Sequence, residues 1–447
     1  MRSRLMSPFW MPVWFFLAGI LSGTVALHAE ASRTAPLAWI DALFTATSAL
    51  CVTGLSVVDT GSFFTTSGQT VILVLIQVGG LGIMTFTSLT MYLLGRRVSL
   101  TDRIAVGQSL LHDPAFKLST FLVRVVIGTL ALEGAGALAL WSLDPHGFGP
   151  FSAVFHSISA FCNAGFGLYS DSLMAWRTDW GVNLVFMALI TLGGLGFAVL
   201  NECGQLSLSL LRGRRPRVHR AHWVSWHTRV VLTTSLALAL GGAALIFISE
   251  VMGGEVTGPW KEQILSSLFT SVTCRTAGFN TINTPHMTNV SLILMLGLMF
   301  IGGSPGSCAG GVKTTSARVW LGLFLAQLRG RSQVKVSWYA LSRPALNRAF
   351  TLIVFASALV LTATLILTVT EGGDIPHPEA RGQLLDVLFE VVSAFGTVGL
   401  STGLTAKLTL PGKWVICGLM FIGRLGPIWL LSALQSWQQE PKYRLPE

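Results

Sequence analysis

The sequence predicts an all-α polytopic membrane protein: four repeats, each a helix, a re-entrant loop and a second helix, surround a pseudo-fourfold axis and give eight transmembrane helices. Three observations support this fold class. Of the 447 residues, 51% are hydrophobic and only 11% are charged, against about 25% charged in soluble domains. Apolar runs of about 20 residues, long enough to cross a bilayer as helix, recur along the chain. One short motif also occurs four times. The low charged fraction and the recurring apolar runs together exclude a soluble multidomain protein.

The first motif is a Phe, a helical stretch bearing Ser or Thr, and a Gly followed by Leu or Phe. It reads FTATSALCVTGL, FHSISAFCNAGF, FTSVTCRTAGF and FEVVSAFGTVGL, and its glycines Gly54, Gly165, Gly278 and Gly399 are 111, 113 and 121 residues apart. A second motif, read as VGGLG, LGGLG, IGGSPG and IGRLG, follows each copy after 25 to 29 residues. Two motifs with one period predict repeats over residues 1–100, 101–220, 221–340 and 341–447.

Each repeat contains two long apolar segments with a short amphipathic stretch between them. Short stretches such as Leu37 to Leu50 and Leu384 to Phe395 span about 14 residues, roughly 20 Å as helix, so we expect them to enter and leave on one side. The first long segment follows Arg2 and Arg4 but is too long for a signal peptide, and we expect it to be retained. The long segments are 8–28, 67–94, 118–141, 181–211, 228–252, 288–328 (interrupted), 346–370 and 411–434.

Basic residues gather between the repeats, whereas segments within the repeats are mostly acidic. By the positive-inside rule the basic face is cytoplasmic, so both termini are expected in the cytoplasm and the short helices enter from outside. Topology then explains the net charge of +10 without a nucleic-acid partner, and the basic loops could also contact anionic lipid or a cytoplasmic subunit. The cations are Arg96, Arg97, Arg103, Arg212, Arg214, Arg215, Arg217, Arg220, Arg318, Arg329, Arg331, Lys335, Arg343 and Arg348.

Four re-entrant loops around one axis can form a path for cations. Backbone that is not helical leaves polar groups unpaired in a membrane, at a cost on the order of several kcal/mol each, unless it faces protein or water. Carbonyl oxygens aimed at a shared path can replace an ion's hydration shell, and each short helix ends toward that path with roughly half a negative charge. Glycine permits the close approach, and no carboxylate lies in the four strings. The alternative for any single glycine is helix packing.

These strings, together with QVGGLGIMTF, FIGGSPGSCAGGVKTT and GRLGP, resemble the membrane subunits of the Trk/Ktr/HKT superfamily of potassium transporters, and within it the KtrB type. The resemblance covers effectively the whole chain. It implies a pore of four M1-P-M2 units, a homodimer of such pores in the lipid bilayer, and a cytoplasmic nucleotide-binding regulatory ring of the KtrA or TrkA type. It also implies potassium (K⁺) uptake across the cell inner membrane, often stimulated by sodium (Na⁺), with no cofactor bound by this chain.

The resemblance also places a selectivity filter. Sodium-transporting plant relatives have Ser at the first filter glycine, whereas all four positions are Gly here, which favours potassium. A sodium-coupled or sodium-permeable transporter of the same fold is the alternative, and a passive channel is not separated from a symporter. Cys162 and Cys308 depart from the family pattern. The expected filter residues are Cys51, Val52, Thr53, Gly54, Asn163, Ala164, Gly165, Thr276, Ala277, Gly278, Thr397, Val398 and Gly399.

The third repeat departs from the others, because its second helix is interrupted by GGSPGSCAGG at Gly302 to Gly311. Gly303 aligns with the mid-helix Gly80 and Gly194, so we expect a gating loop inside the membrane; a cytoplasmic turn is the alternative. A Walker-like spelling at Gly306 to Thr314 lacks a preceding strand, and we expect no nucleotide binding there. The expected gate residues in the loop are Gly302, Gly303, Ser304, Pro305, Gly306, Ser307, Gly310 and Gly311.

In the fourth repeat the aligned position is Arg424. It follows Gly412 by about 12 residues, roughly 18 Å of helix, so we expect it near mid-membrane as a positive barrier beneath the filter. The alternative is an Arg satisfied by helix-end carbonyls or loop oxygens. Arg275 is expected to brace the loop. The sequence contains no HExxH motif and no pair of Asp on facing apolar helices, so we do not expect an enzyme.

Overall fold

The computed structural model describes residues 10–81, 118–213, 224–253, 259–337, 339–373, 376, 379–380 and 382–426. Within these ranges the chain is helical apart from loops and one small antiparallel sheet. Parts of the predicted long segments at 8–28, 67–94 and 411–434 lie outside the described residues. So do seven of the predicted linking cations, which are Arg96, Arg97, Arg103, Arg214, Arg215, Arg217 and Arg220.

Each successive quarter of the chain begins with a long helix, continues with a short helix, and ends with one or two further helices. The first contains α2 (Met11–His28), η1 (Glu30–Ser32), α3 (Trp39–Leu50), α4 (Thr60–Phe63) and α5 (Thr66–Gly80). The second contains α8 (Leu118–Leu143), α9 (Pro150–Phe161), η2 (Met174–Trp176), α10 (Trp180–Leu195) and α11 (Phe197–Leu211). The third contains α12 (Trp226–Gly253), α13 (Trp260–Thr273), η3 (Thr284–His286), α14 (Asn289–Phe300), α15 (Thr314–Leu328), β1 (Lys335–Val336) and β2 (Tyr339–Ala340). The fourth contains α16 (Arg343–Gly372), α17 (Gln383–Gly396), η4 (Thr405–Lys407) and α18 (Leu410–Leu425).

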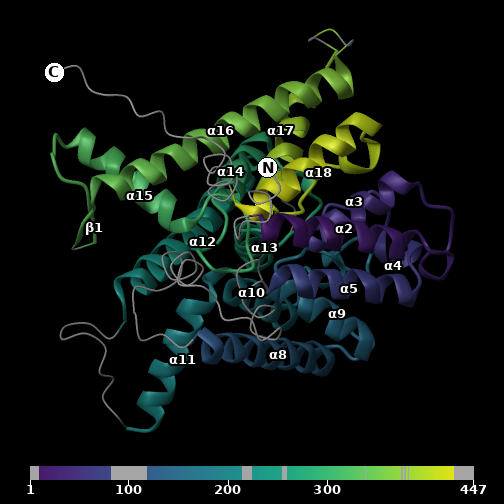
Figure 1. The fold of residues 1–447 in the computed structure, drawn as a ribbon, viewed down its shortest axis with the longest axis horizontal. Helices are drawn as coiled ribbons and strands as arrows, with labels where there is room; N and C mark the ends of the chain where they lie inside the picture. The colour runs from purple at the N-terminus through teal and green to yellow at the C-terminus, as the bar shows by residue number, and fades with distance from the viewer. Residues whose placement is uncertain are drawn as a thin grey trace.

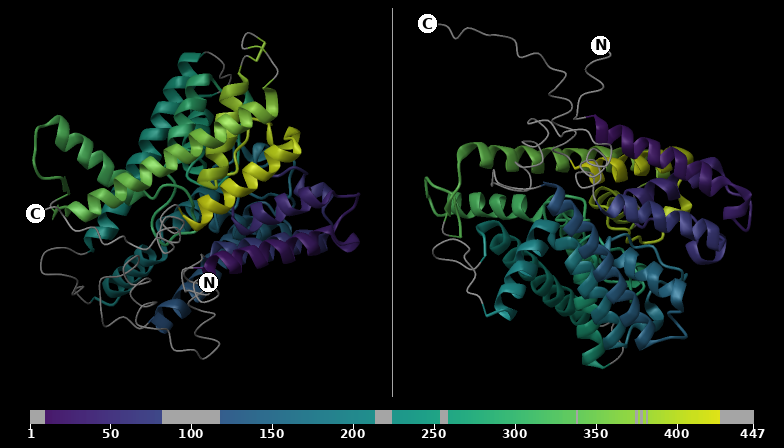
Figure 2. Two further views of the ribbon diagram at one scale, coloured as in Figure 1. Left: turned by 45° about the horizontal axis from the view of Figure 1, so that its top comes forward. Right: turned by 60° about the horizontal axis from the view of Figure 1, so that its bottom comes forward.

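Helix packing closes the four quarters into a ring. In each quarter the short helix packs on the long helix before it, as α2 with α3, α8 with α9, α12 with α13, and α16 with α17. Between quarters, a later helix packs on the next short helix: α5 on α9, α10 on α13, α14 on α17, and α18 on α3. The last pair joins the end of the chain to its start, and the yellow α18 lies beside the purple first quarter in Figures 1 and 2.

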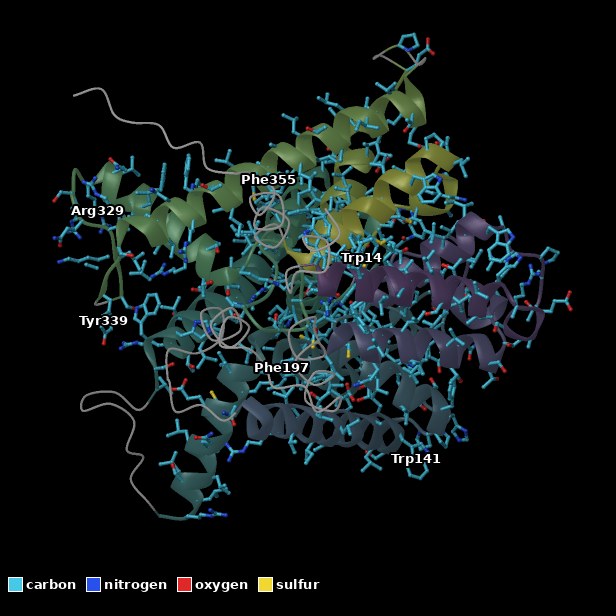
Figure 3. The ribbon with its side chains drawn as sticks, in the orientation of Figure 1. Trp14, Trp141, Phe197, Arg329, Tyr339 and Phe355 are labelled. Atoms are coloured by element: carbon cyan, nitrogen blue, oxygen red, sulfur yellow. The ribbon has the colours of Figure 1, made fainter. Side chains whose placement is uncertain are left out.

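The short helices form the core, and the long helices cover them. Every residue of α3 from Phe44 to Leu50 is buried, as is every residue of α17 from Phe389 to Gly396. The long helices instead leave large apolar side chains exposed, including Leu365 and Val369 on α16 and Trp141 on α8 (Figure 3). Apolar side chains on the outside of a helix bundle are what a lipid environment favours. All six cysteines are free thiols.

By length and composition, three described helices could cross a membrane: Val123–Leu143, Trp226–Gly253 and Ala345–Gly372. A fourth is possible if Trp180–Leu195 and Phe197–Leu211 count together as one span. The expected continuous segment 181–211 is therefore wrong in detail, since these two helices are bent by 109°. The break falls at Gly196, whose φ of +93° is left-handed, and the next N–H, of Phe197, donates to the carbonyl of Gly306. Eight crossing helices and the four repeat boundaries stay predictions.

Candidate functional site

Each short helix ends three to five residues before a motif glycine, so its negative end faces the string that follows. Every string is left-handed at the glycine and at the residue two positions before it. A left-handed backbone costs other residues roughly 1–2 kcal/mol, so its fourfold recurrence marks a functional constraint. The φ angles are +57°, +58°, +74° and +51° at Val52, Asn163, Thr276 and Thr397, and +89°, +71°, +79° and +93° at Gly54, Gly165, Gly278 and Gly399.

The four glycines form a closed ring. A Cβ atom built on any one of them would lie under 3.0 Å from the carbonyl oxygen of the residue before another glycine. No side chain therefore fits at these positions unless a neighbouring string moves. The structure brings all thirteen predicted filter residues together, and their role as an ion filter stays a prediction. The glycines and the carbonyls they face are Gly54 with Ala164, Gly165 with Ala277, Gly278 with Val398, and Gly399 with Thr53.

Hydroxyl groups on the short helices hold the strings in place. The Ser48 and Ser393 Oγ atoms accept hydrogen bonds from the backbone N–H of Gly54 and Gly399, both at 3.1 Å. The Ser/Thr-bearing stretch occurs in all four copies of the motif and is therefore a sequence signal for these hydrogen bonds, although no role was predicted for it. The other two quarters fix the residue after the glycine instead: Ser159 Oγ donates to the Phe166 carbonyl at 2.7 Å, and Thr273 Oγ1 to the Phe279 carbonyl at 2.6 Å.

A cavity of about 420 Å³ opens on one side of the ring, and all four glycines line it. Asp59 is the one charged residue among those that line this cavity, and it lies outside the motifs that predicted the filter. Its Oδ1 accepts hydrogen bonds from the N–H groups of Gly61 and Ser62, at 2.8 and 3.2 Å. Elsewhere in the described ranges, no three His, Cys, Asp or Glu side chains gather as ligands for a resident metal. The chemistry offered at the ring is therefore that of backbone carbonyls and hydroxyls.

The predicted gating loop lies on the opposite side of the ring. It contacts residues that precede the filter glycines: a Cβ built on Gly310 would meet the Thr397 hydroxyl, and one on Gly311 would lie 3.4 Å from the Gly396 Cα. The cavity, in contrast, is lined by residues that follow them, from Gly399 to Ala406. The loop is fastened to the second quarter by two further bonds, from Ser304 N to the Gly194 carbonyl at 3.0 Å and from Cys308 N to the Gly193 carbonyl at 3.1 Å.

Two arginines, the buried Arg424 and the partly buried Arg275, hold the loop from other elements. Arg424 on α18 is 7% exposed and donates to the carbonyls of Cys308 in the loop and Gly79 on α5. These partners are of the kind expected if Arg424 is satisfied by loop and helix carbonyls, while its role as a barrier stays a prediction. Arg275 donates to the Ser235 carbonyl at 3.1 Å and to the Gly302 carbonyl at 3.3 Å. It therefore braces the start of the loop.

The ring and its loop can be compared with known proteins. The model of the TrkH family, described as a cation transport protein, matches residues 3–437. The chain belongs to this family. The family expected from the motifs is thereby confirmed, and with it the class of protein, a membrane cation transporter of the Trk/Ktr type.

Individual members of the TrkH family match over most of the chain. The Ktr system potassium uptake protein B of Bacillus subtilis is 38% identical over 98% of this chain and 94% of its own. The potassium/sodium uptake protein NtpJ of Enterococcus hirae is 36% identical, covering 100% of this chain and 97% of its own. The crystal structure of the potassium transporter TrkH from Vibrio parahaemolyticus superposes with a TM-score of 0.74 at 20% identity, covering 97% and 86% of the two chains. That last likeness shows the fold.

Proposed function

We propose that this chain takes up potassium ions through the space enclosed by the four strings. The closed ring of Gly54, Gly165, Gly278 and Gly399 carries the proposal, because each glycine packs against the carbonyl group of another string. A ring of carbonyl oxygens can replace the hydration shell of a cation. The name of the Bacillus subtilis relative, a potassium uptake protein, supports potassium as the ion.

Local backbone geometry supports carbonyl coordination. Left-handed residues that alternate with other conformations turn successive N–H groups to one side of the chain, which leaves the carbonyl groups on the other. Each string has left-handed residues two positions apart, as at Val52 and Gly54. The four helix C-termini add roughly half a negative charge each. Because these helix ends precede the glycines, their negative charge lies on the side of the ring that faces away from the cavity, where it favours a cation that has passed the ring.

In this proposal the loop Gly302–Gly311 and Arg424 form the gate. The loop lies across the side of the ring that faces away from the cavity, and Arg424 links it to α5 of the first quarter. A cation leaving the ring would therefore encounter both the loop backbone and a guanidinium group. We infer that displacement of the loop together with Arg424 opens the path.

The proposed assembly is a homodimer of such pores with a cytoplasmic nucleotide-binding ring of the KtrA or TrkA type. The name of the Bacillus subtilis relative as one protein of a Ktr system supports a partner subunit. Four M1-P-M2 repeats with eight spans, an inner-membrane location and cytoplasmic termini complete the proposal. The described cations Arg212, Arg318 and Arg329 support this orientation through the positive-inside rule.

Sodium is the second candidate ion. The Enterococcus hirae relative, 36% identical over the full chain, is named a potassium/sodium uptake protein. A sodium-coupled or sodium-permeable transporter would use the same ring, with sodium either stimulating potassium uptake or crossing with it.

One experiment separates these possibilities. The purified chain is reconstituted in proteoliposomes, and uptake of K⁺, Rb⁺ and Na⁺ tracers is measured with and without a cytoplasmic partner. Potassium and rubidium uptake that exceeds sodium uptake supports the proposal, and potassium uptake that rises with added sodium supports coupling. Equal uptake of all three ions by a monodisperse protein would overturn the assignment of a potassium filter.

A further inference from the structure

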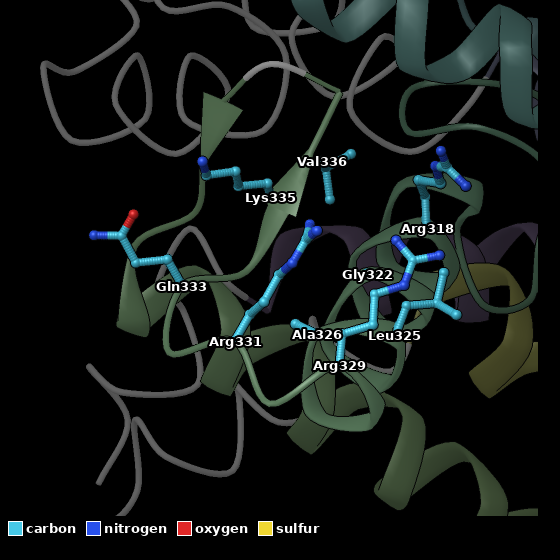
Figure 4. A pocket seen from close by; sticks show the side chains of 9 residues that line it. All are labelled: Arg318, Gly322, Leu325, Ala326, Arg329, Arg331, Gln333, Lys335 and Val336. Carbon is cyan, nitrogen blue, oxygen red and sulfur yellow. The ribbon is translucent and has the colours of Figure 1, made fainter.

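A second cavity, of about 100 Å³, lies far from the ring at the end of α15. It is enclosed by one face of that helix and by the segment that folds back as β1 (Figure 4). Gly322 permits this fold-back, because a Cβ built there would lie 3.1 Å from a Val336 methyl group. Trp226 on α12 fixes the strand by donating to the Val336 carbonyl at 3.2 Å. The cavity is therefore a built feature of the third quarter.

The cavity is strongly basic. Four cations line it, Arg318, Arg329, Arg331 and Lys335, and no carboxylate does. The only ion pair between described residues joins Lys413 to Asp41, so none of the four is neutralised by a described carboxylate. In Figure 4 the guanidinium groups of Arg318 and Arg329 extend to the same side of α15. Guanidinium groups gathered without acidic partners favour a phosphate group as ligand.

Exposed apolar side chains lie beside the basic side chains of the cavity. On α15 itself, Leu325 lines the cavity and Leu321 lies about one turn before it, and both are large apolar side chains that are exposed. Tyr339 on β2 is exposed as well, and it packs edge-on against Trp226. A ligand held here would place a charged group among the cations and hydrocarbon along α15, which is the chemistry of a phospholipid.

The position of the cavity near the end of a candidate membrane span also favours a phospholipid ligand. The candidate span Ala345–Gly372 begins five residues after β2 ends at Ala340. The cavity therefore lies at the end of a membrane span, where aromatic and basic side chains meet lipid headgroups.

We propose that the cavity between α15 and β1 binds the phosphate group of an anionic phospholipid. The site does not depend on which ion crosses the ring. Because α15 begins at Thr314, three residues after the loop Gly302–Gly311 ends, a lipid bound at the other end of α15 would restrain the helix that continues the gate.

The test uses the full chain purified in detergent and follows thermal unfolding by tryptophan fluorescence. Dioctanoyl-phosphatidylglycerol is titrated against dioctanoyl-phosphatidylcholine, and inorganic phosphate forms a third arm. We expect the unfolding midpoint to rise with the anionic lipid only. Each cation near an anionic lipid contributes roughly fivefold in affinity, so Arg329→Gln with Arg331→Gln should weaken apparent lipid affinity by about thirtyfold.

The matched control is Arg212→Gln with Arg229→Gln, which removes two exposed arginines outside the cavity. It should change the apparent affinity by less than about twofold. The single variant Arg331→Gln, expected to lose about fivefold, keeps the test available if the double variant does not fold. Equal losses in the cavity and control variants would overturn the proposal in favour of diffuse charge. An equal rise with inorganic phosphate would replace the lipid by a soluble phosphate ligand.

Discussion

Replacing Gly54 by Ser should lower the preference for potassium over sodium by at least about tenfold. The φ of Gly54 is +89°, and its Cβ would lie under 3.0 Å from the Ala164 carbonyl oxygen and 2.9 Å from the Gly165 Cα. A left-handed serine costs roughly 1–2 kcal/mol, and overpacking costs about 1–3 kcal/mol more. Because both obstructing atoms are backbone, the strain has to move a neighbouring string. A difference of about 1.4 kcal/mol already gives tenfold in relative flux.

The matched control is Gly403→Ser. Gly403 has φ of +97° and lines the same cavity, but a Cβ built there meets nothing within 4 Å. It carries the same backbone strain without contact to another string, so its selectivity should equal that of the wild type. Both variants are reconstituted, and tracer uptake of K⁺ and Na⁺ is measured in parallel.

Two results would count against this reasoning. Unchanged relative fluxes in a folded Gly54→Ser variant would show that the ring does not select the ion. An equal loss of selectivity in Gly403→Ser would assign the effect to backbone strain rather than to contact between strings.

Three further outcomes are expected. Arg424→Ala should increase flux by up to about a hundredfold without changing the K⁺/Na⁺ ratio, since a charge about 5 Å from the ion repels it by roughly 3 kcal/mol at an effective dielectric near 20; unchanged flux would leave Arg424 a structural residue. Excision of residues 303–310 should raise flux and weaken control by a partner, and the ends can be joined because a Gly302 Cβ lies 3.3 Å from the Gly311 Cα; lower flux in a folded variant would show that the loop supports the path. Asp59→Asn should raise the KM for potassium by about twofold to fivefold at low salt, with the difference vanishing at high salt; the same KM at low salt would deny Asp59 a role in attracting cations.

Self-similarity of the sequence located the four strings, because each motif glycine combines a left-handed backbone with a neighbouring string that leaves no room for a Cβ atom. Gly54 and Gly399 both occupy such positions. The expected short helices also agree, since α3 and α17 end at Leu50 and Gly396. Local pattern suffices for features that a few neighbouring residues determine.

Features that depend on distant segments were not predictable in the same way. The bend at Gly196 follows a motif, LGGLG, that reads almost like the VGGLG of the first quarter. What differs is the partner, since the Phe197 N–H donates to Gly306 in the loop of the third quarter. The contacts of Arg424 likewise join three quarters of the chain. Hydropathy and motif spacing predict neither the Phe197 hydrogen bond nor the Arg424 contacts, because these contacts depend on how the quarters pack.

The ring is closed by the two ends of the chain, which has a consequence for biosynthesis. The Gly399 string lies against Thr53, Lys413 forms an ion pair with Asp41 at 2.6 Å, and Arg424 reaches the Gly79 carbonyl across 345 positions of sequence. While the first three quarters leave the ribosome, the nascent chain is an open arc with polar backbone at both of its free edges. Insertion of the last quarter must close that arc, so a translational stop before about residue 400 yields no partial pore. The transporter is assembled in its final step of synthesis.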